Sequence, residues 1–357
     1  MIKLLKSRFL TTIAASFFAS YALVAQIDNF DFLKSGVEDA SKITEAYINP
    51  WANAFGAGAN GCWYNTAKPH EFGGFDITIG LNVGFVPSSD NTYDVSKLGL
   101  KNFTGSGMAP TVSGPNEEGP TLSSKPVSGV APITFTTPPG ADWGYMPVPT
   151  LQAGIGLPLG SELKVRYIPR INIPGTDGNI SSWGLGLLHS IMQYIPGDKV
   201  LPFDVSVFGG YTKLTGNLPI DVPPGTPQYY SSAYPSTAWD NQNFELIADA
   251  WNVSAIASFN LPVITFYGGL GYTGTKTRIN MTGNFPMPTL NPEHSTTSYV
   301  YEDAGVVKDF PEIEVKNFSG LRANAGFRLK FAVVTWHIDY TWAQYSVVST
   351  GLGISFR

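Results

Sequence analysis

Cysteine is nearly absent from this sequence, with Cys62 the only one among 357 residues. A single thiol cannot form an intramolecular disulfide or a thiolate metal cluster, which excludes disulfide-stabilised scaffolds and thiolate zinc sites. Charged residues are also scarce, at 14%, whereas average soluble domains contain about 25%. Beyond the first 25 residues, no apolar run is long enough to form a membrane-spanning helix. The chain is therefore poor in charge and has no helical span.

The first 25 residues have the parts of a secretory signal peptide. Lys3, Lys6 and Arg8 precede an apolar stretch, and Ala25 is a small residue suited to the cleavage site. Three of the 22 Lys and Arg residues lie in this segment, so its removal leaves 19 against 27 Asp and Glu. The exported chain is acidic, and we expect no nucleic-acid partner.

Glycine and aromatic residues are abundant, with 38 Gly and 13% aromatics. The last forty residues show how they are used. From Leu321 to Phe331, apolar residues alternate with Arg, Asn, Gly and Lys, and the pattern restarts in residues 334–342 and 348–356. Strict alternation predicts strands with one apolar and one polar face. Segments of about ten such residues are typical of membrane barrels.

Ten such segments are predicted along the chain, at about 73–86, 149–157, 162–170, 182–194, 203–215, 244–259, 263–282, 321–331, 334–342 and 348–356. Long polar connectors alternate with short ones, which is typical of outer-membrane barrels. We predict an all-β fold, an antiparallel transmembrane β-barrel, in residues 73–357. Long extracellular loops are expected at 87–148, 216–243 and 283–312. Ten strands are counted, and ten to fourteen are possible if residues 87–148 contain further hairpins. Strand ten is expected to pair with strand one.

Residues 26–72 have a different pattern. Apolar residues at three- and four-residue steps predict a helix over 27–48, ended by Pro50. The following stretch is rich in Gly, Asn and aromatics and needs water or protein around its backbone. Two interpretations remain open: a periplasmic segment, or a plug inside the barrel. The plug candidates are Asn49, Pro50, Trp51, Trp63 and Tyr64.

The polar faces of the predicted strands give the residues expected to line the lumen. They are Asp76, Lys164, Arg166, Arg170, Asp204, Arg322, Arg328, Lys330, His337 and Asp339. Their basic excess could attract an anionic solute or a fatty-acid carboxylate. Alternatively, these charges pair internally between wall and plug, because unpaired buried charge is costly.

One arrangement suggests catalysis. His337 and Asp339 share a strand face and could orient Ser346 or Ser349 as a nucleophile. The sequence has no Gly-x-Ser-x-Gly motif to hold such a serine. We therefore predict that the protein is not an enzyme. The histidines lack metal-binding spacing, and neither a metal nor a cofactor is predicted.

Three stretches resemble an uncharacterised outer-membrane barrel family of Bacteroidetes. They are residues 48–54, Ile-Asn-Pro-Trp-Ala-Asn-Ala; residues 61–70, Gly-Cys-Trp-Tyr-Asn-Thr-Ala-Lys-Pro-His; and residues 73–76, Gly-Gly-Phe-Asp. That family is similar in layout to the long-chain fatty-acid and aromatic-hydrocarbon transporters, in which an N-terminal hatch plugs a barrel. The resemblance implies a plugged barrel and transfers no ligand-binding residue. Phe356, next to the last residue, resembles the C-terminal signal of bacterial outer-membrane proteins.

The functional prediction follows from these patterns. We expect a protein of the bacterial outer membrane, in contact with its lipid, that acts as a channel or transporter for small, hydrophobic solutes. The alternative is a structural or surface-adhesion barrel that binds a partner through its long outer loops.

Overall fold

The computed structural model describes residues 35–126, 132, 134–172, 177–195, 202–220, 222, 236–286, 289–290, 299–300, 306–308, 310–315 and 317–356. The predicted signal peptide and the first part of the predicted helix, residues 27–34, lie outside these described residues.

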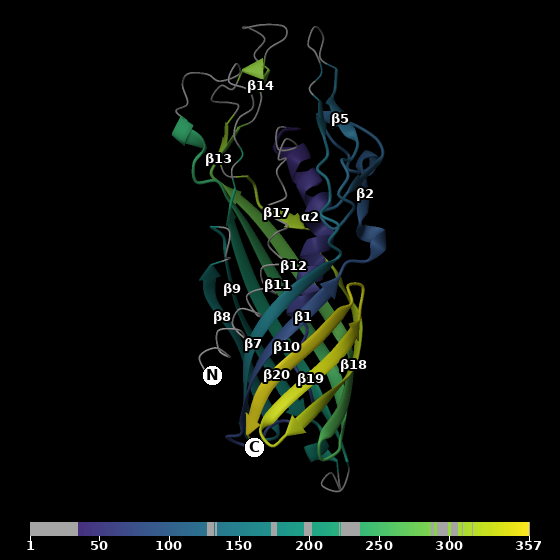
Figure 1. The fold of residues 1–357 in the computed structure, drawn as a ribbon, viewed down its shortest axis with the longest axis vertical. Coiled ribbons are helices and arrows are strands. Elements are labelled where there is room, and N and C mark those ends of the chain that lie inside the picture. Colours follow the sequence, from purple (N-terminus) through teal and green to yellow (C-terminus); the bar gives the residue numbers. More distant parts are fainter. Residues whose placement is uncertain are drawn as a thin grey trace, which may run out of the picture.

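Ten long strands form a closed antiparallel barrel, which confirms the predicted fold class (Figure 1). The strands are β1 (Phe75–Phe85), β7 (Tyr145–Leu157), β8 (Ser161–Asn172), β9 (Asn179–Ser190), β10 (Phe203–Pro219), β11 (Asn243–Asn260), β12 (Ile264–Thr282), β18 (Ser319–Phe331), β19 (Val334–Trp342) and β20 (Val347–Phe356). The first and last strands pair as expected, with Phe75 opposite Phe356 and Gly84 opposite Val347. Pairing of β11 with β12 completes the ring.

The two faces of the barrel wall differ in polarity. Exposed and buried residues alternate along β1, with Phe75, Ile77 and Ile79 exposed and Asp76 and Thr78 buried. Large apolar side chains also cover the outside of the other strands, such as Leu185, Val253 and Leu352. Because β1 has eleven residues, it is long enough to cross a hydrocarbon layer. The outer face therefore matches lipid rather than water.

Exposed aromatic side chains gather at two levels of this outer face. At the edge of the barrel that holds the C-terminus, Phe75 stacks on Phe356 with ring centroids 5.0 Å apart. Higher up, Trp183 pairs with Tyr211 and Trp251 pairs with Tyr272, at 5.5 and 6.0 Å. Aromatic girdles at both interfaces are typical of membrane barrels.

The connectors divide the molecule into two ends. At the short-turn end, β7–β8, β11–β12 and β18–β19 are joined by only two or three residues. The long-loop end carries the connectors after β1, β10 and β12, together with the short link 343–346. The C-terminus lies at the short-turn end (Figure 1). Among the described residues, no helix is long and apolar enough to cross a membrane.

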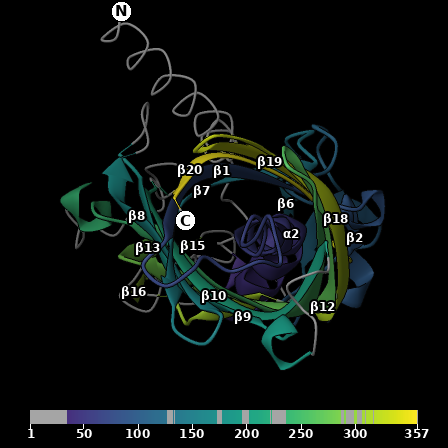
Figure 2. The same ribbon diagram turned by 90° about the horizontal axis from the view of Figure 1, so that it is seen from below.

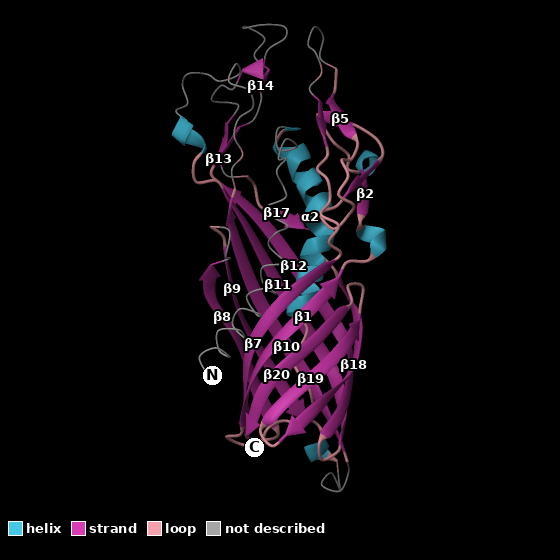
Figure 3. Ribbon diagram, in the orientation of Figure 1, coloured by secondary structure: helices cyan, strands magenta, loops and turns pink. Residues whose placement is uncertain are grey.

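One long helix, α2 (Val37–Ala59), occupies the lumen (Figure 2; Figure 3, cyan). Its first half stands among the long loops, where Ile43 and Tyr47 pack against Phe103 and Ile279. Its second half enters the barrel, where Phe55 packs among wall residues such as Leu214. Residues 60–72 continue to the short-turn end, where the N–H of Gly73 donates to the carbonyl of Gly156.

The expectation that Pro50 ends the helix is wrong. Pro50 lies inside α2, which continues to Ala59. Proline removes one helical hydrogen bond and strains the turn before it. The residues after it include Ala52, Ala54 and Ala57, which are strong helix formers and are buried against the barrel wall. Packing and propensity together outweigh the break.

Small strands pair at the long-loop end. They are β2 (Thr92–Asp94) with β4 (Met108–Pro110), β5 (Thr121–Ser124) with β3 (Phe103–Thr104) and β6 (Thr134–Thr136), β13 (Asn284–Pro286) with β16 (Val306–Lys308), and β14 (Thr289–Leu290) with β15 (Tyr299–Val300). Strand β17 (Ile313–Val315) pairs with β12. Short 3-10 helices cover Ser88–Asp90, Val95–Lys97, Met192–Tyr194 and Ser236–Trp239. In its described part, segment 87–148 adds no strand to the barrel before β7.

Several strand boundaries differ from the prediction. The fourth strand ends at Ser190, and Met192–Tyr194 forms a 3-10 helix instead. Strand β10 extends beyond the predicted 215 to Pro219, where Leu218 pairs with Phe244 of β11. The alternation of apolar and polar residues does not mark these strand ends, because a strand segment outside the lipid layer needs no lipid-facing side. Pairing with a neighbour sets its length there.

Candidate functional site: a plugged lumen and a cavity at its mouth

The plug, defined as residues 37–72, is fixed in the middle of the lumen by Arg166 of β8. This side chain is 2% exposed, and its guanidinium lies 3.6 Å from the ring centroid of Trp63. It donates hydrogen bonds to the carbonyls of Ala59 (2.8 Å) and Gly61 (2.6 Å) and to the side chain of Gln152 (3.0 Å). One wall arginine thus binds the backbone of the plug where α2 ends.

A second arginine binds the same turn from the opposite wall. Arg322 of β18 donates to the carbonyl of Asn60 at 3.0 Å. The amide of Asn60 donates to the hydroxyl of Thr273 at 2.8 Å. The last carbonyls of a helix lack helical partners and carry partial negative charge, so cations are favourable there. Arg166 and Arg322 both place a positive charge at the carbonyls at the end of α2.

The His–Asp pair of β19 does not form a catalytic relay. The Nε2 atom of His337 lies 3.1 Å from the Sγ atom of Cys62 on the plug. Asp339 accepts a hydrogen bond from the hydroxyl of Tyr267 at 2.9 Å. Both side chains are buried, and each is used in a contact that closes the lumen. That the protein is not an enzyme stays a prediction.

An ionic cluster holds the plug at the short-turn end. His70 of the plug, Asp76 of β1 and Glu162 of β8 place donor atoms within 4.8 Å of one another. The Nδ1 atom of His70 is 2.9 Å from Glu162, and its Nε2 atom is 3.0 Å from the hydroxyl of Ser355. Such a set can hold a metal ion, but the ammonium of Lys164 contacts Glu162 and lies 3.9 Å from Asp76. The cluster already contains its cation, and we interpret it as an ion-pair network.

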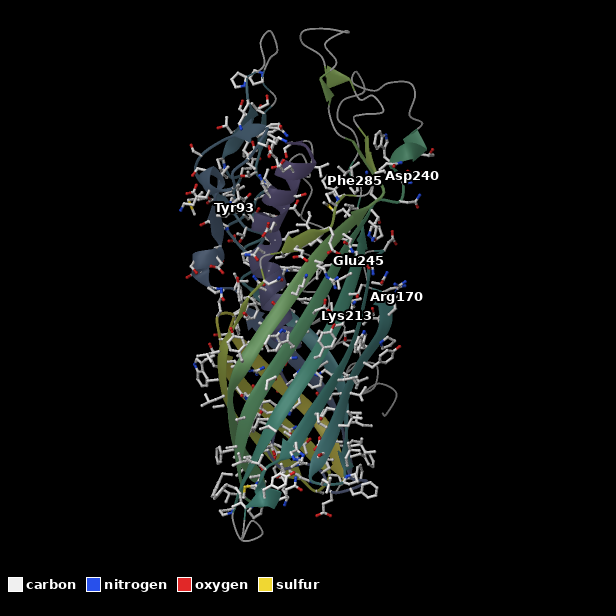
Figure 4. The ribbon with its side chains drawn as sticks, turned by 180° about the vertical axis from the view of Figure 1, so that it is seen from behind. Tyr93, Arg170, Lys213, Asp240, Glu245 and Phe285 are labelled. Carbon is white, nitrogen blue, oxygen red and sulfur yellow. The ribbon has the colours of Figure 1, made fainter. Side chains whose placement is uncertain are left out.

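The structure places most of the predicted lumen residues together on the inner face. The buried ones are Asp76, Lys164, Arg166, Arg322, Arg328, His337 and Asp339. Asp204 and Lys330 are half-buried at the short-turn end of the same face. The assignment of Arg170 to the lumen is wrong, because its side chain is exposed on the outside (Figure 4). A register irregularity between Ile168 and Ile171 breaks the two-residue period there.

The plug candidates occupy two regions. Asn49, Pro50 and Trp51 lie in the middle of α2. Trp63 and Tyr64 follow the helix and are buried with Phe208. The hydroxyl of Tyr64 donates to the side chain of Asn324 at 2.7 Å. From the sequence, the segment is either periplasmic or a plug, and its position inside the barrel corresponds to the plug.

A cavity of about 740 Å³ lies at the long-loop end, between α2 and the barrel rim. We call it the mouth cavity. One stripe of α2 forms one wall, and its members recur at three- and four-residue steps: Lys42, Glu45, Ala46, Asn49, Pro50 and Asn53. The facing wall includes Asp90, Tyr93, Lys97, Phe318, Gln344 and Tyr345. Tyr93 stands beside α2, above the barrel (Figure 4). Lys97 and Gln344 are exposed, so the cavity opens outwards.

Fixed polar groups organise this cavity. The hydroxyl of Tyr345 donates to Asp90 at 2.7 Å, and the amide of Asn53 donates to the side chain of Asn49 at 2.9 Å. The hydroxyl of Tyr93 is buried and has no hydrogen-bond partner among the described residues. Burial raises the pKa of Tyr93 and of Tyr345 above the ordinary value for tyrosine. Both phenols therefore remain protonated near neutral pH.

Sequence reasoning missed the mouth cavity. The sequence held one indication of it, the polar stripe of α2 formed by Lys42, Glu45, Asn49 and Asn53. The predicted helix end at Pro50 separated Asn53 from the other three residues. The facing residues come from three separate segments, around 89–98, 317–319 and 344–345. Only the closed barrel brings these segments together.

Comparison with known proteins assigns the chain to a family. It belongs to a family of unknown function (DUF6588), which matches residues 1–356. The resemblance to an uncharacterised family is thereby confirmed in part, and its restriction to Bacteroidetes stays a prediction. No curated protein matches the sequence.

Solved structures with some similarity include an attachment protein, an autotransporter domain and a toluene transporter. The Ail protein of Yersinia pestis is 10% identical and matches over 80% of this chain and 98% of its own, with a TM-score of 0.25. The translocator domain of the autotransporter NalP of Neisseria meningitidis is 13% identical over 88% and 97%, at 0.26. The toluene transporter TbuX of Ralstonia pickettii is 9% identical over 82% and 91%, at 0.23. TM-scores of this size carry no conclusion about the function of this chain.

Proposed function

We propose that this protein is a barrel of the bacterial outer membrane that admits a small solute through its lumen when the plug moves. The apolar outer face, the two aromatic levels and the predicted export signal support this location. The long-loop end then faces the outside, and the mouth cavity is the entrance. The restriction to Bacteroidetes remains part of the proposal.

The observation that carries this proposal is the space that the wall leaves for the plug. A Cβ atom at Gly84 would lie 2.1 Å from the carbonyl oxygen of Ala54, and one at Gly156 would lie 2.0 Å from that of Glu71. At Gly269 it would meet the hydroxyl of Tyr64 at 2.7 Å. Small barrels that serve only as anchors can fill their interior with wall side chains. This wall instead leaves a passage wide enough for a helix.

The polar contacts between the plug and the wall are of a kind that can be broken when the plug moves. Arg166 and Arg322 bind plug carbonyls, and His70 joins the ionic cluster. If the plug shifts, water can replace these hydrogen bonds at modest net cost. The apolar clusters around Phe55 and Trp63 oppose the movement and keep the resting barrel closed.

The native thiol of Cys62 allows a direct test. A Cβ atom at Gly80 of β1 would lie 2.7 Å from the Sγ atom of Cys62, which is close enough for a disulfide in Gly80→Cys. In proteoliposomes, we expect oxidised Gly80→Cys to show no swelling in isotonic arabinose, glucose or maltose. Reduction with dithiothreitol should restore the swelling rate of the wild-type protein.

Two control variants distinguish the effect of the disulfide from the steric effect of a side chain at residue 80. Gly80→Ala introduces the same Cβ atom without a thiol, and Gly80→Cys combined with Cys62→Ser cannot form the bond. Both should be insensitive to oxidation. If neither the wild-type protein nor the reduced variant gives sugar-dependent swelling or single-channel conductance, the lumen is not a passage and the proposal fails.

The expected hydrophobic solute has less support than a polar one. Most side chains around the mouth cavity are polar, including Asn49, Asn53, Asp90 and Gln344. The apolar groups are few, with Phe318 the largest. An apolar solute entering here would remove water from amide and carboxylate groups without replacing their hydrogen bonds.

A second candidate function is surface adhesion, and one observation favours it. The described part of segment 87–148 folds onto the first half of α2 rather than remaining separate. Asp39 accepts hydrogen bonds from the backbone N–H groups of Lys101, Asn102 and Phe103 at 2.6, 2.8 and 3.0 Å. A rigid projecting surface suits partner binding. Cell binding by this protein without any solute flux would favour this alternative.

A further inference from the structure

We propose that the mouth cavity binds a neutral carbohydrate, whose hydroxyls are held by α2 and the barrel rim. This inference rests on the proposed function in one respect, the role of the cavity as entrance.

The α2 wall offers both donors and acceptors. Asn49 and Asn53 present their amides next to each other, and an amide can donate and accept at once. Pro50 has no N–H group to donate to the carbonyl of Ala46. Ala46 and Pro50 both line the cavity, so the residue whose carbonyl loses its usual helical donor is part of the cavity wall. A sugar hydroxyl is suited to it, because it donates and accepts at one atom.

The facing wall completes a hydrogen-bonding set. The hydroxyl of Tyr93 is buried without a protein partner among the described residues, and leaving such a group unsatisfied costs about 1–3 kcal/mol. Asp90 is held in place by Tyr345 at 2.7 Å and by Ser89 at 2.9 Å. A carboxylate fixed in this way can accept hydrogen bonds from ligand hydroxyls.

The charge of the cavity argues for a neutral ligand. Its two cationic side chains, Lys42 and Lys97, are offset by Glu45 and Asp90. Both lysines also have other partners: Lys42 contacts Glu38 at 3.0 Å, and Lys97 lies 3.4 Å from Asp94. An anionic ligand such as a phosphate would find no free basic cluster here. A purely apolar ligand would leave the amides unpaired.

Tyr93 and Leu98 supply the apolar surface that a sugar ring needs, because both line the cavity and are only half-buried. Phe318 and Tyr345 also line it, but their packed rings, with centroids 5.2 Å apart, are only 5% and 1% exposed. One face of a pyranose ring presents mainly C–H groups, which pack on aromatic carbon while the hydroxyls point outwards. Amphipathic rings such as tyrosine serve both requirements. The volume of about 740 Å³ is in the usual range for small-molecule sites.

The test uses the full-length protein in detergent micelles on a printed array of neutral, acidic and sulfated oligosaccharides. We expect binding to a subset of the neutral glycans. Titration calorimetry with a positive neutral oligosaccharide should then show about tenfold weaker binding for Tyr93→Phe and for Asn49→Leu, because each loses one hydrogen bond in a buried site. Tyr194→Phe and Asn116→Leu change the same residue types outside the cavity and should bind like the wild-type protein.

Each outcome decides the inference. Heat-modifiable migration on gels confirms that each variant is folded. Binding confined to acidic or sulfated glycans, no binding to any neutral glycan, or unchanged affinity in both cavity variants would overturn the inference. Competition by the same oligosaccharide free in solution indicates a small soluble sugar, whereas binding only to long chains indicates a polysaccharide at a cell surface.

The outcome for the proposed function is separate. Glycan binding without liposome swelling keeps the carbohydrate site and rejects the passage. Swelling without any neutral-glycan binding keeps the passage and rejects the carbohydrate site.

Discussion

At the scale of single residues, the lumen shows why buried charge does not require a ligand. Arg166 is buried, yet it contacts two plug carbonyls, the amide of Gln152 and the ring of Trp63. The sequence predicted its inward position from alternation alone. The alternative of internal pairing between wall and plug describes Arg166 better than attraction of an anionic solute. No alternation pattern could have identified its plug partners Ala59 and Gly61, which lie 107 and 105 residues earlier in the chain.

Replacing this arginine tests the importance of these contacts. Arg166→Leu leaves the carbonyls of Ala59 and Gly61 buried without their donor, and hydrogen bonds to charged groups contribute about 1.5–3 kcal/mol each. We expect the free energy of unfolding in urea to fall by about 3 kcal/mol or more. Arg170→Leu, on the same strand but exposed, should change it by less than about 0.5 kcal/mol. Equal effects of the two changes would contradict the assigned role of Arg166.

At the scale of elements, α2 differs most from its prediction. The sequence indicated a helix and supplied its polar stripe, but Pro50 gave a false end. The helix continues because Ala52, Ala54 and Ala57 pack inside the barrel. Its direction is a second result. Val37 stands at the long-loop end and Ala59 lies within the lumen, so the plug runs through the barrel from the long-loop end to the short-turn end.

Cysteine labelling tests this direction. Glu38 lies at the start of α2, and Glu71 lies at the other end of the plug; both are exposed. Glu38→Cys should react with a membrane-impermeant maleimide on intact cells, because we place it outside. Glu71→Cys should react only after the outer membrane is permeabilised. Background labelling should be low because Cys62 is buried. The reverse result would show that the barrel is inserted in the opposite orientation.

At the scale of the whole molecule, closure of the sheet creates both a lipid-facing surface and a lumen. The seam between β1 and β20 places Ile79 opposite Leu352 on the outer face. It also places Asp76 and Ser355 opposite each other on the inner face, next to His70 of the plug. The same register therefore forms part of the membrane belt and part of the ionic cluster.

A charge on the outer face tests the membrane assignment. Ile79 lies in the middle of β1 and is 40% exposed. For Ile79→Arg in lipid vesicles, we expect the free energy of unfolding to fall by about 2–4 kcal/mol, the cost of arginine near the bilayer midplane. Leu159→Arg in a short turn, where the original side chain is 78% exposed, should cost at most about 1 kcal/mol. If both variants unfold like the wild-type protein, the outer face does not contact lipid.

The sequence by itself determined the strand pattern, a barrel of ten to fourteen strands and most of the inward-facing residues, because side chains on a strand alternate and a lipid-facing wall must alternate in polarity. The alternation of polar and apolar residues placed Arg170 on the wrong face, because the register shifts between Ile168 and Ile171. The one sign of this shift in the sequence is Pro169, since proline inside a strand is found at edges and bulges. Only the tertiary structure decided that α2 continues past Pro50, what Arg166 binds, and where Asn49, Asp90, Tyr93 and Tyr345 meet. These depend on contacts between residues far apart in the chain, which exist only once the sheet has closed around the plug.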